Sequence, residues 1–385
     1  MNRHLIRKIG MASMAAVMIL GMAGCGGNAA KSGASSKAAG GADIGFVAAL
    51  SGGAAAYGQS QKQGIDMAVD EINQSGDFKV NIDEEDTKGE PTQAISVIKK
   101  MINDKKSIVI GPMLSGEMKA VGPILQQAQM PTLGISLTAE GITDMGDYIF
   151  RNSVPESMNI PQTIAKSKKL VGYKKVAIIY SNNNEQMVSA FHTYQEVCQK
   201  EGLEVVDIET FADKDSDFSA QLTKIQASDP DAIIVDALYQ EGALILKKAR
   251  EMGMNQPVIG NNGFVSPQLI KQAGPAADNV YVSSMWSLTK DDPKTQEFIK
   301  KFRERYGHDP DQFAAGAYDG VYMAVDAMKR AGTTTDHKKI RDALASMKDF
   351  HGVCGNFSFN SKRDPVVDLV LLKIENGQFN EVKTE

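Results

Sequence analysis

The residues best suited to hold a small anion lie in the stretch 111–143, GPMLSGEMKAVGPILQQAQMPTLGISLTAEGIT. Ser115 comes just before the first turn of a predicted helix, and Ser136 and Thr138 follow the next predicted strand. In an open α/β sheet, ligands bind outside the carboxyl ends of the strands, where free amides at a helix N-terminus can receive an anion. The two neighbouring strand ends, each carrying hydroxyls and free amides, are therefore predicted to form a small polar cup.

These hydroxyls also have purely structural explanations. Ser115 could cap the helix that follows it, and Ser136 or Thr138 could satisfy a turn, since Ser and Thr are common in both settings. The residue types and their spacing leave both explanations open.

The elements that must position the cup follow a repeating pattern. The run Ile108-Val109-Ile110 does not alternate with polar residues, which is typical of a strand buried on both faces in a parallel sheet. The predicted strands lie at 42–50, 79–82, 108–110, 131–135, 176–180, 204–208, 232–235 and 258–259, and helices at 57–73, 92–103, 117–129, 185–201, 218–225 and 241–252. Three more helices are predicted near 293–306, 312–330 and 338–347, and final strands near 357–359, 366–374 and 379.

Repeated β-α units with short connections predict an α/β fold with doubly wound parallel sheets. The 344 residues from 42 to 385 exceed what one hydrophobic core usually holds, so two lobes are expected.

Three segments in order carry a family resemblance: ALSGGAAAYGQSQKQGIDMAVDEIN at 49–73, the stretch 111–143, and AAGAYDGVYMAVDAMKRAG at 314–332. Together they resemble the leucine/isoleucine/valine-binding family of type I periplasmic binding proteins, the solute receptors of ABC importers. The similarity is colinear from about Ala42 to the end of the chain. It implies two lobes joined by a three-crossing hinge near 152, 287 and 356, with lobe 1 formed by 42–152 plus 288–355 and lobe 2 by 153–287 plus 356–385.

The resemblance also implies a ligand site. Ser115 and Thr138 match positions that bind the ligand carboxylate through hydroxyl and amide, and Ser136 matches a position whose backbone carbonyl receives the ammonium group. Tyr57 matches an aromatic residue at the cleft edge, and Phe313 matches a position in the side-chain pocket.

Three positions depart from the pattern of amino-acid binders. Asn262 stands where they carry an acidic partner for the ammonium group, and Glu185 and Leu238 stand where they carry aromatic residues. A neutral Asn accepts a hydrogen bond but lacks the strength of a charged acceptor. Glu185 could supply the negative charge from another direction, or it could stabilise the dipole of the helix it begins.

The first 25 residues have the layout of a secretory signal. Arg3, Arg7 and Lys8 precede an apolar run at 9–20, which is too short for a confident membrane span. The ending Met-Ala-Gly-Cys25 resembles a lipoprotein signal-peptidase box, so a signal peptide at 1–24, a lipidated Cys25 and a flexible tether to residue 41 are expected. The alternative is an ordinary secretory signal in which Cys25 is incidental.

Composition argues against other functions. Loss of residues 1–24 removes three positive charges and turns the net charge from −5 to −8, which does not suit a nucleic-acid partner. No HExxH, P-loop or G-x-S-x-G motif occurs, so neither catalytic residues nor a metal or cofactor is expected. Cys198 and Cys354 are expected to be buried free thiols, although a disulfide between them stays open. Trp286 is expected to pack in the core or, alternatively, to line the cleft.

The function expected from the resemblance is that of a monomeric, extracytoplasmic, lipid-anchored solute-binding protein. It would bind an amino acid, of the branched-chain type or related, and deliver it to an ABC permease in the membrane. A non-amino carboxylate or an amide-type solute is the first alternative, and a ligand-sensing regulatory subunit is the second.

Overall fold

The computed structural model describes residues 41–383. The predicted signal peptide, Cys25 and nearly all of the tether lie outside the described residues. Within residues 41–383, no helix combines the length and the hydrophobicity that a membrane crossing requires.

The first lobe is built on a five-stranded sheet in which every neighbouring pair is parallel. The strand order is β2-β1-β3-β4-β5, so the chain starts near the centre and winds in both directions. The strands are β1 (Ala42–Ala48), β2 (Val80–Asp86), β3 (Ile108–Ile110), β4 (Thr132–Gly134) and β5 (Ile149–Arg151).

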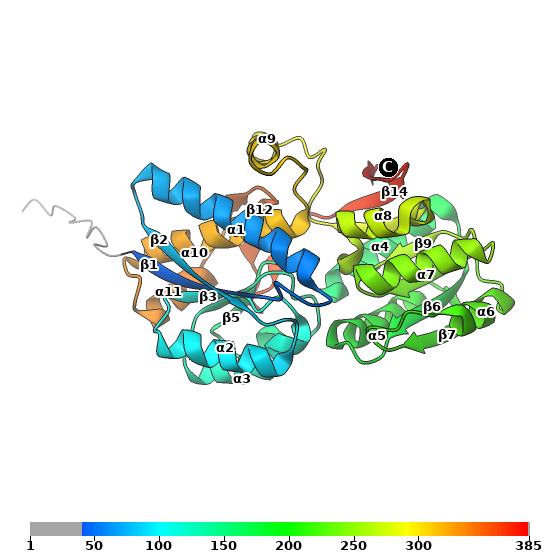
Figure 1. Cartoon of the computed structure of the whole chain (residues 1–385), viewed down its shortest axis with the longest axis horizontal. Coiled ribbons are helices and arrows are strands. Elements are labelled where there is room, and N and C mark those ends of the chain that lie inside the picture. Colours follow the sequence, from blue (N-terminus) through cyan, green and yellow to red (C-terminus); the bar gives the residue numbers. More distant parts are fainter. Residues whose placement is uncertain (1–40, 384–385) are drawn as a thin grey trace, which may run out of the picture. The chain divides into compact units, whose positions relative to one another are not determined.

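Helices cover both faces of this sheet. The helices of the first lobe are α1 (Ala55–Ser75), α2 (Pro91–Asn103), α3 (Ser115–Gln127), α9 (Pro293–Tyr306), α10 (Gln312–Ala331) and α11 (His337–Ala345). Figure 1 shows α1 on one side of β1 and β3, and α2 and α3 on the other. Val109 packs with the α2 and α3 side chains, whereas its neighbours Ile108 and Ile110 pack with those of α1 and α10. Burial on both faces explains why this strand shows no polar alternation.

Close packing of α1 against α10 depends on Gly64. A Cβ atom at this position would lie only 2.0 Å from the carbonyl oxygen of Ala314, which is a backbone atom and cannot turn aside. The glycine therefore lets α10, which carries several residues of the site described below, approach the first lobe closely.

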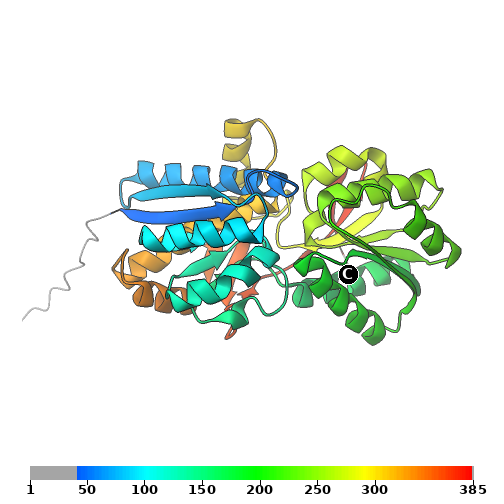
Figure 2. The same cartoon turned by 60° about the horizontal axis from the view of Figure 1, so that its bottom comes forward.

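The second lobe is built on a seven-stranded sheet with the order β15-β14-β10-β9-β8-β6-β7. Its strands are β6 (Lys175–Ser181), β7 (Glu204–Phe211), β8 (Ala232–Asp236), β9 (Val258–Gly260), β10 (Val280–Ser284), β14 (Val370–Glu375) and β15 (Gln378–Val382). Strands β6 to β10 are parallel, but β14 and β15 pair antiparallel at one edge. The predicted class, α/β with doubly wound parallel lobes, is confirmed, with this antiparallel edge as an addition. Figure 2 shows the red strands of the chain's end lying within the second lobe.

The helices of the second lobe again cover both faces: α4 (Glu156–Val171), α5 (Glu185–Lys200), α6 (Ser219–Ala227), α7 (Tyr239–Glu251) and α8 (Pro267–Ala273). Ile178 packs with α4 and α5, and its neighbour Ile179 packs with α6 and α7. Cys198 and Cys354 are buried free thiols, as expected. Trp286 is 2% exposed and packs edge-on against Phe298, so core packing is its role.

The chain passes between the lobes three times, and the third passage differs from the expectation. The first lies between β5 and α4, and the second between β10 and α9. Strand β12 (Gly355–Phe359) was expected to begin the return to lobe 2, but it belongs to a small sheet with β11 (Phe350–Gly352) and β13 (Pro365–Val366).

The small sheet is attached to the first lobe. Phe359 packs against Phe150 of β5 with ring centroids 5.3 Å apart, and Asp364 pairs with the buried Arg151 at 2.6 Å. The third passage therefore lies between β13 and β14, about ten residues later than expected. Hydrophobic alternation indicates a strand but not the sheet that it joins, which is why the sequence misplaced this boundary.

Candidate functional site

The ends of β3 and β4 meet and hold one another through the predicted hydroxyl residues. Ser115 is the first residue of α3 rather than its N-cap, which is Leu114, and its Oγ accepts a hydrogen bond from the Ala139 N–H at 3.3 Å. Ser136 Oγ donates to the Met113 carbonyl at 3.0 Å. The two strand ends thus form one polar unit, as the sequence predicted.

Ser136 has an unusual backbone conformation. Its φ of 89° lies in the left-handed region, which is uncommon for residues other than glycine. Two hydrogen bonds of its side-chain oxygen hold it there: the one to Met113 and a second that Oγ accepts from Gln61 Nε2 at 3.1 Å. Gln61 Nε2 also donates to the neighbouring Ile135 carbonyl at 2.8 Å. Helix α1 therefore fixes the end of β4 through Gln61.

Thr138 is fully buried, yet its hydroxyl makes no hydrogen bond of good geometry. Its backbone carbonyl is occupied, because it accepts the Glu156 N–H at 2.9 Å. A buried hydroxyl without a partner is uncommon in folded proteins and marks a position where a ligand could complete the bonding.

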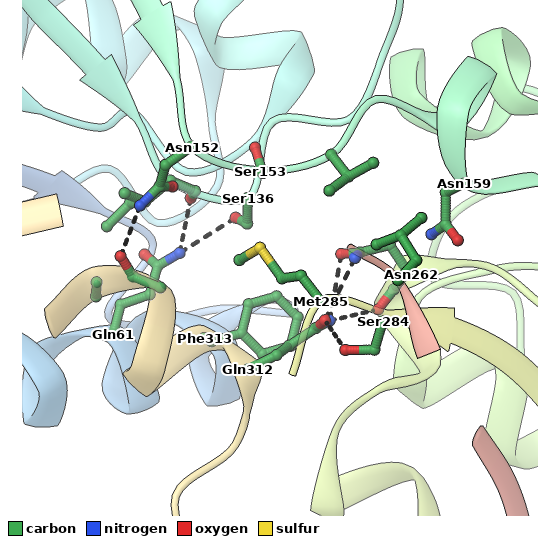
Figure 3. Close-up of a pocket in the computed structure, with 15 residues that line it drawn as sticks. Gln61, Ser136, Asn152, Ser153, Asn159, Asn262, Ser284, Met285, Gln312 and Phe313 are labelled. Atoms are coloured by element: carbon green, nitrogen blue, oxygen red, sulfur yellow. Dashed lines mark hydrogen bonds between the residues drawn. The ribbon is translucent and has the colours of Figure 1, made fainter. Parts of the chain in front are cut away.

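A pocket of about 400 Å³ lies beside this polar unit. Residues of both lobes and of all three passages line it, and Figure 3 shows ten of them labelled. The lining residues are Gln61, Ile135, Ser136, Asn152, Ser153, Val154, Asn159, Asn262, Ser284, Met285, Gln312, Phe313, Gly316, Ala317 and Leu369. Among the predicted site residues, Ser136, Asn262 and Phe313 line the pocket directly, whereas Ser115 and Thr138 are buried behind the lining.

The polar lining consists of amides and hydroxyls, and no lining side chain is charged. Asn262 and Gln312 are linked across the lobes: Gln312 Nε2 donates to the Asn262 carbonyl at 2.8 Å, and Gln312 Oε1 accepts from Ser284 Oγ at 3.1 Å. Asn152 Nδ2 donates to the Gly316 carbonyl at 2.7 Å. Each amide is thus oriented by a neighbour, which is the arrangement expected of a pre-organised binding site.

Tyr57 lies next to the pocket but does not line it. It is 3% exposed, its ring lies at a tilt of 39° to that of Phe313 with the centroids 4.5 Å apart, and burial raises the pKa of its phenol well above the usual value. Its hydroxyl bonds to the backbone of the second lobe, so the structure gives Tyr57 a contact between the lobes.

Glu185 and Leu238 are not brought into the pocket. Glu185 is in the first turn of α5 with a half-exposed side chain, and its Oε1 lies 3.6 Å from Lys119 Nζ of α3. Leu238 precedes α7 and packs against the core. The structure therefore separates Glu185 from the residues that line the pocket.

Sequence reasoning missed two buried carboxyl groups near the site. Glu156, at the start of α4, is fully buried, and burial raises its pKa to about 7, opposed by the nearby Thr138 hydroxyl, the Gln186 amide and the Asn262 N–H, which favour the ionised form. Asp236, at the end of β8, has its pKa raised well above the usual value by burial, although Asn261 donates to its Oδ1.

Each of these carboxyl groups has one oxygen without a partner, namely Glu156 Oε2 and Asp236 Oδ2. A carboxylate that directly follows a buried apolar strand, as Asp236 follows Ala232 to Val235, is the signal that could have predicted one of them. Within residues 41–383, no group of three or more His, Cys, Asp or Glu side chains is placed to hold a metal ion.

Comparison with known proteins gives the family. The model of a family described as periplasmic binding protein matches residues 42–378. The chain belongs to this family. Periplasmic binding proteins are non-enzymatic, solute-binding components of transporters, so this one is a binding protein whose family implies an extracytoplasmic location and a permease partner.

Two relatives named for branched-chain amino acids are similar to this chain over most of its length. The Leu/Ile/Val-binding protein homolog 2 of Brucella abortus (strain 2308) is 28% identical over 352 residues, covering 88% of this chain and 92% of the relative. The branched-chain amino acid transporter substrate binding protein LivJ of Streptococcus pneumoniae, solved with isoleucine, is 32% identical with a TM-score of 0.83, covering 90% of this chain and 100% of that one.

A more distant structure shares the fold alone. The solute binding protein of an ABC transporter from R. palustris, solved with benzoate, has a TM-score of 0.82 at 22% identity, covering 89% of this chain and 96% of that one. The resemblance inferred from the sequence is thus confirmed at the level of the family and the fold.

Proposed function

We propose that this periplasmic binding protein captures an amino acid, of the branched-chain type or related, and delivers it to the permease of an ABC importer. The observation that carries the proposal is the pocket of about 400 Å³ whose lining comes from both lobes and from all three passages between them. A solute held there contacts both lobes at once, so its binding selects the arrangement in which the lobes meet.

The carboxylate of the solute is assigned to Ser115 and Thr138. The Thr138 hydroxyl supports this, because it lies near the Glu156 carboxyl without a well-aligned hydrogen bond and can turn toward an acceptor on the solute. Ser115, as the first residue of α3, adds a hydroxyl and lies at the positive end of the helix dipole.

The ammonium group is assigned to other acceptors around the pocket. The backbone carbonyl of Ser136 and the amide oxygen of Asn262 are the predicted ones, and both residues line the pocket. In their ionised form, buried Glu156 and Asp236 would add the negative charge that Asn262 lacks. An ammonium group nearby would favour the ionised form of both carboxyl groups.

The apolar part of the solute is assigned to the ring of Phe313 together with Ile135, Val154, Met285 and Leu369. Isoleucine is the ligand in the structure of the LivJ relative at 32% identity, which supports an aliphatic side chain here.

An amide-type solute or a non-amino carboxylate is the second candidate. It is favoured by the pocket lining itself, in which amides and hydroxyls supply every polar side chain. Such a lining can bind a neutral solute without an unpaired charge.

The anchoring is also proposed from the sequence. We infer that the chain is cleaved before Cys25, lipidated there and held to the membrane as a monomer through the tether. Glu185, outside the pocket lining, is assigned a pairing with Lys119 of the first lobe.

The test is the identification of the solute. Mass spectrometry of molecules carried through purification would be followed by thermal unfolding of ligand-free protein with single amino acids, simple carboxylates and primary amides. A solute present at about a hundred times its dissociation constant should add roughly 2.7 kcal/mol to the free energy of unfolding. Stabilisation by carboxylates or amides but by no amino acid would favour the second candidate.

A further inference from the structure

A second, smaller pocket adjoins the first and shares part of its lining. Its volume is about 250 Å³, part of it open to solvent, and Asn152 and Met285 line both pockets. Figure 3 shows the Met285 side chain reaching into the middle of the first pocket beside the ring of Phe313. The two spaces are therefore neighbours, with Met285 at their common boundary.

The second pocket is suited to an apolar group. Much of its lining is formed by Met323, Phe350, Phe357 and Val367. Its one charged side chain, Asp319, already accepts backbone N–H bonds from Val353 at 2.7 Å and from Cys354 at 2.9 Å. Because both carboxylate oxygens of Asp319 are bonded in this way, the pocket offers a solute apolar contact rather than polar recognition.

Met285 is a movable boundary. It lies just after β10 in the second passage, and its methyl group rests on the bare backbone of Gly316 in α10, where an added Cβ would be 3.4 Å from Met285 Cε. Methionine is unbranched and has three rotatable bonds, so it can change rotamer at lower cost than a branched or aromatic residue.

We propose that the solute site continues past Met285 into the second pocket, which takes an apolar extension of the solute, and that Met285 limits the length of this extension. The inference rests on the proposed function, because the polar end of the same solute occupies the first pocket. Met285 is thus a residue that determines specificity by chain length.

The experiment measures affinity against chain length. Dissociation constants are determined by calorimetry for straight-chain 2-amino acids from alanine to 2-aminooctanoic acid, and for straight-chain carboxylates and primary amides of two to eight carbons. In the wild type, the gain in affinity with each methylene should stop where the chain reaches Met285. In Met285→Ala the gain should continue for longer chains, at about fourfold for each methylene that becomes buried.

A second variant keeps the test decisive. Val367 lies in the loop between β13 and β14 and is only partly buried, so Val367→Phe should fill the second pocket with little effect on folding. Adding it to Met285→Ala should abolish the long-chain gain and leave short solutes unaffected. Met252→Ala, a partly buried methionine at the end of α7 and outside both pocket linings, is the matched control and should leave the length limit unchanged.

The outcomes separate this inference from the proposed function. The continuation of the site is wrong if short solutes bind but the length limit is the same in the wild type and in Met285→Ala. It is also wrong if adding Val367→Phe to Met285→Ala leaves the long-chain gain intact. In both cases the proposed function stands. If no member of any series binds either protein, the proposed function fails and this inference fails with it.

Discussion

The phenol oxygen of Tyr57 donates a hydrogen bond to the carbonyl oxygen of Gly263 at 2.8 Å, although 206 positions separate the two residues in the chain. Tyr57 belongs to α1 in the first lobe, and Gly263 lies in the short 3-10 helix Asn262–Phe264 of the second. The same oxygen accepts the N–H of Tyr239 at 2.9 Å. One buried hydroxyl of the first lobe thus bonds to two backbone groups of the second lobe beside the pocket.

Removing this hydroxyl should weaken the contact between the lobes. Tyr57→Phe leaves the Gly263 carbonyl and the Tyr239 N–H without a partner, at a cost of about 1–3 kcal/mol when they are buried. Because this cost falls on the arrangement in which the lobes meet, we expect affinity for the solute to fall about tenfold. Calorimetric titration with the identified solute measures it.

Tyr173→Phe is the matched control for this prediction. The Tyr173 hydroxyl is also buried, but it bonds to Ser167 at 2.7 Å within the second lobe. Its removal should lower the melting temperature and leave the affinity unchanged. Equal loss of affinity in both variants would contradict a specific role of Tyr57 in joining the lobes.

The two cup hydroxyls should differ in their effect on stability but not on binding. Thr138→Val should fold as well as the wild type, because its hydroxyl makes no well-aligned hydrogen bond, whereas Ser115→Ala loses the bond to Ala139 at a cost of about 1 kcal/mol. Both should lower the affinity for a carboxylated solute about tenfold or more. Thr132→Val, which removes a buried hydroxyl bonded to the Met130 carbonyl, is the control. Normal affinity in both cup variants would leave these hydroxyls with structural roles only.

A negative charge at position 262 should distinguish the two classes of solute. Asn262→Asp replaces a neutral acceptor that lines the pocket with a charged one. Binding should tighten if the solute carries an ammonium group nearby, and it should weaken if the solute is a simple carboxylate, because like charges would meet in a desolvated site. A ratio of dissociation constants, wild type to variant, above one therefore indicates an ammonium group on the solute, and a ratio below one indicates a simple carboxylate.

Glu156 should make the stability of the solute-free protein depend on pH. Its folded-state pKa of about 7 lies above the ordinary value of 4.5, so the folded protein holds a proton that the unfolded chain releases between these values. This contribution to stability is therefore fully present below pH 4.5 and is lost as the pH rises to about 7. By linkage, the loss is about 3 kcal/mol over that window.

The measurement is denaturant unfolding of the wild type and of Glu156→Gln from pH 4 to pH 8. Relative to the wild type, the variant should gain stability as the pH rises, because Gln cannot ionise. Glu185→Gln removes a half-exposed carboxylate and is the control. A constant difference between the wild type and Glu156→Gln across this range would show that Glu156 is not the group responsible.

The amino-terminal prediction concerns residues that the structure does not describe. If Cys25 is lipidated, Cys25→Ser should leave the protein unprocessed or move it out of the lipid-modified fraction. Detergent partitioning and mass spectrometry of the mature terminus measure both effects. An unmodified terminus in the wild type would refute the proposed anchor while leaving the binding function untouched.

Local pattern was sufficient for much of the fold and for part of the site. Apolar runs such as Ile108 to Ile110 indicated buried parallel strands, because helices cover both faces of each sheet. Helix α4 was missed, since Pro155 and Pro161 obscured a helix that tertiary packing maintains despite the internal proline. Ser115 and Ser136 were correctly placed together, because neighbouring parallel strands end at the same edge of a sheet.

What the sequence by itself determined is therefore the type of each element, the α/β class and the hydroxyls at the strand ends, since these depend on interactions between residues close in the chain. Only the tertiary structure decided that β12 stays with the first lobe, that Tyr57 bonds to Gly263, and that Glu156 and Asp236 are buried with a free oxygen each. These relationships join residues tens to hundreds of positions apart. Their energies depend on burial and on which surfaces meet, and neither is encoded in the local spacing of residue types.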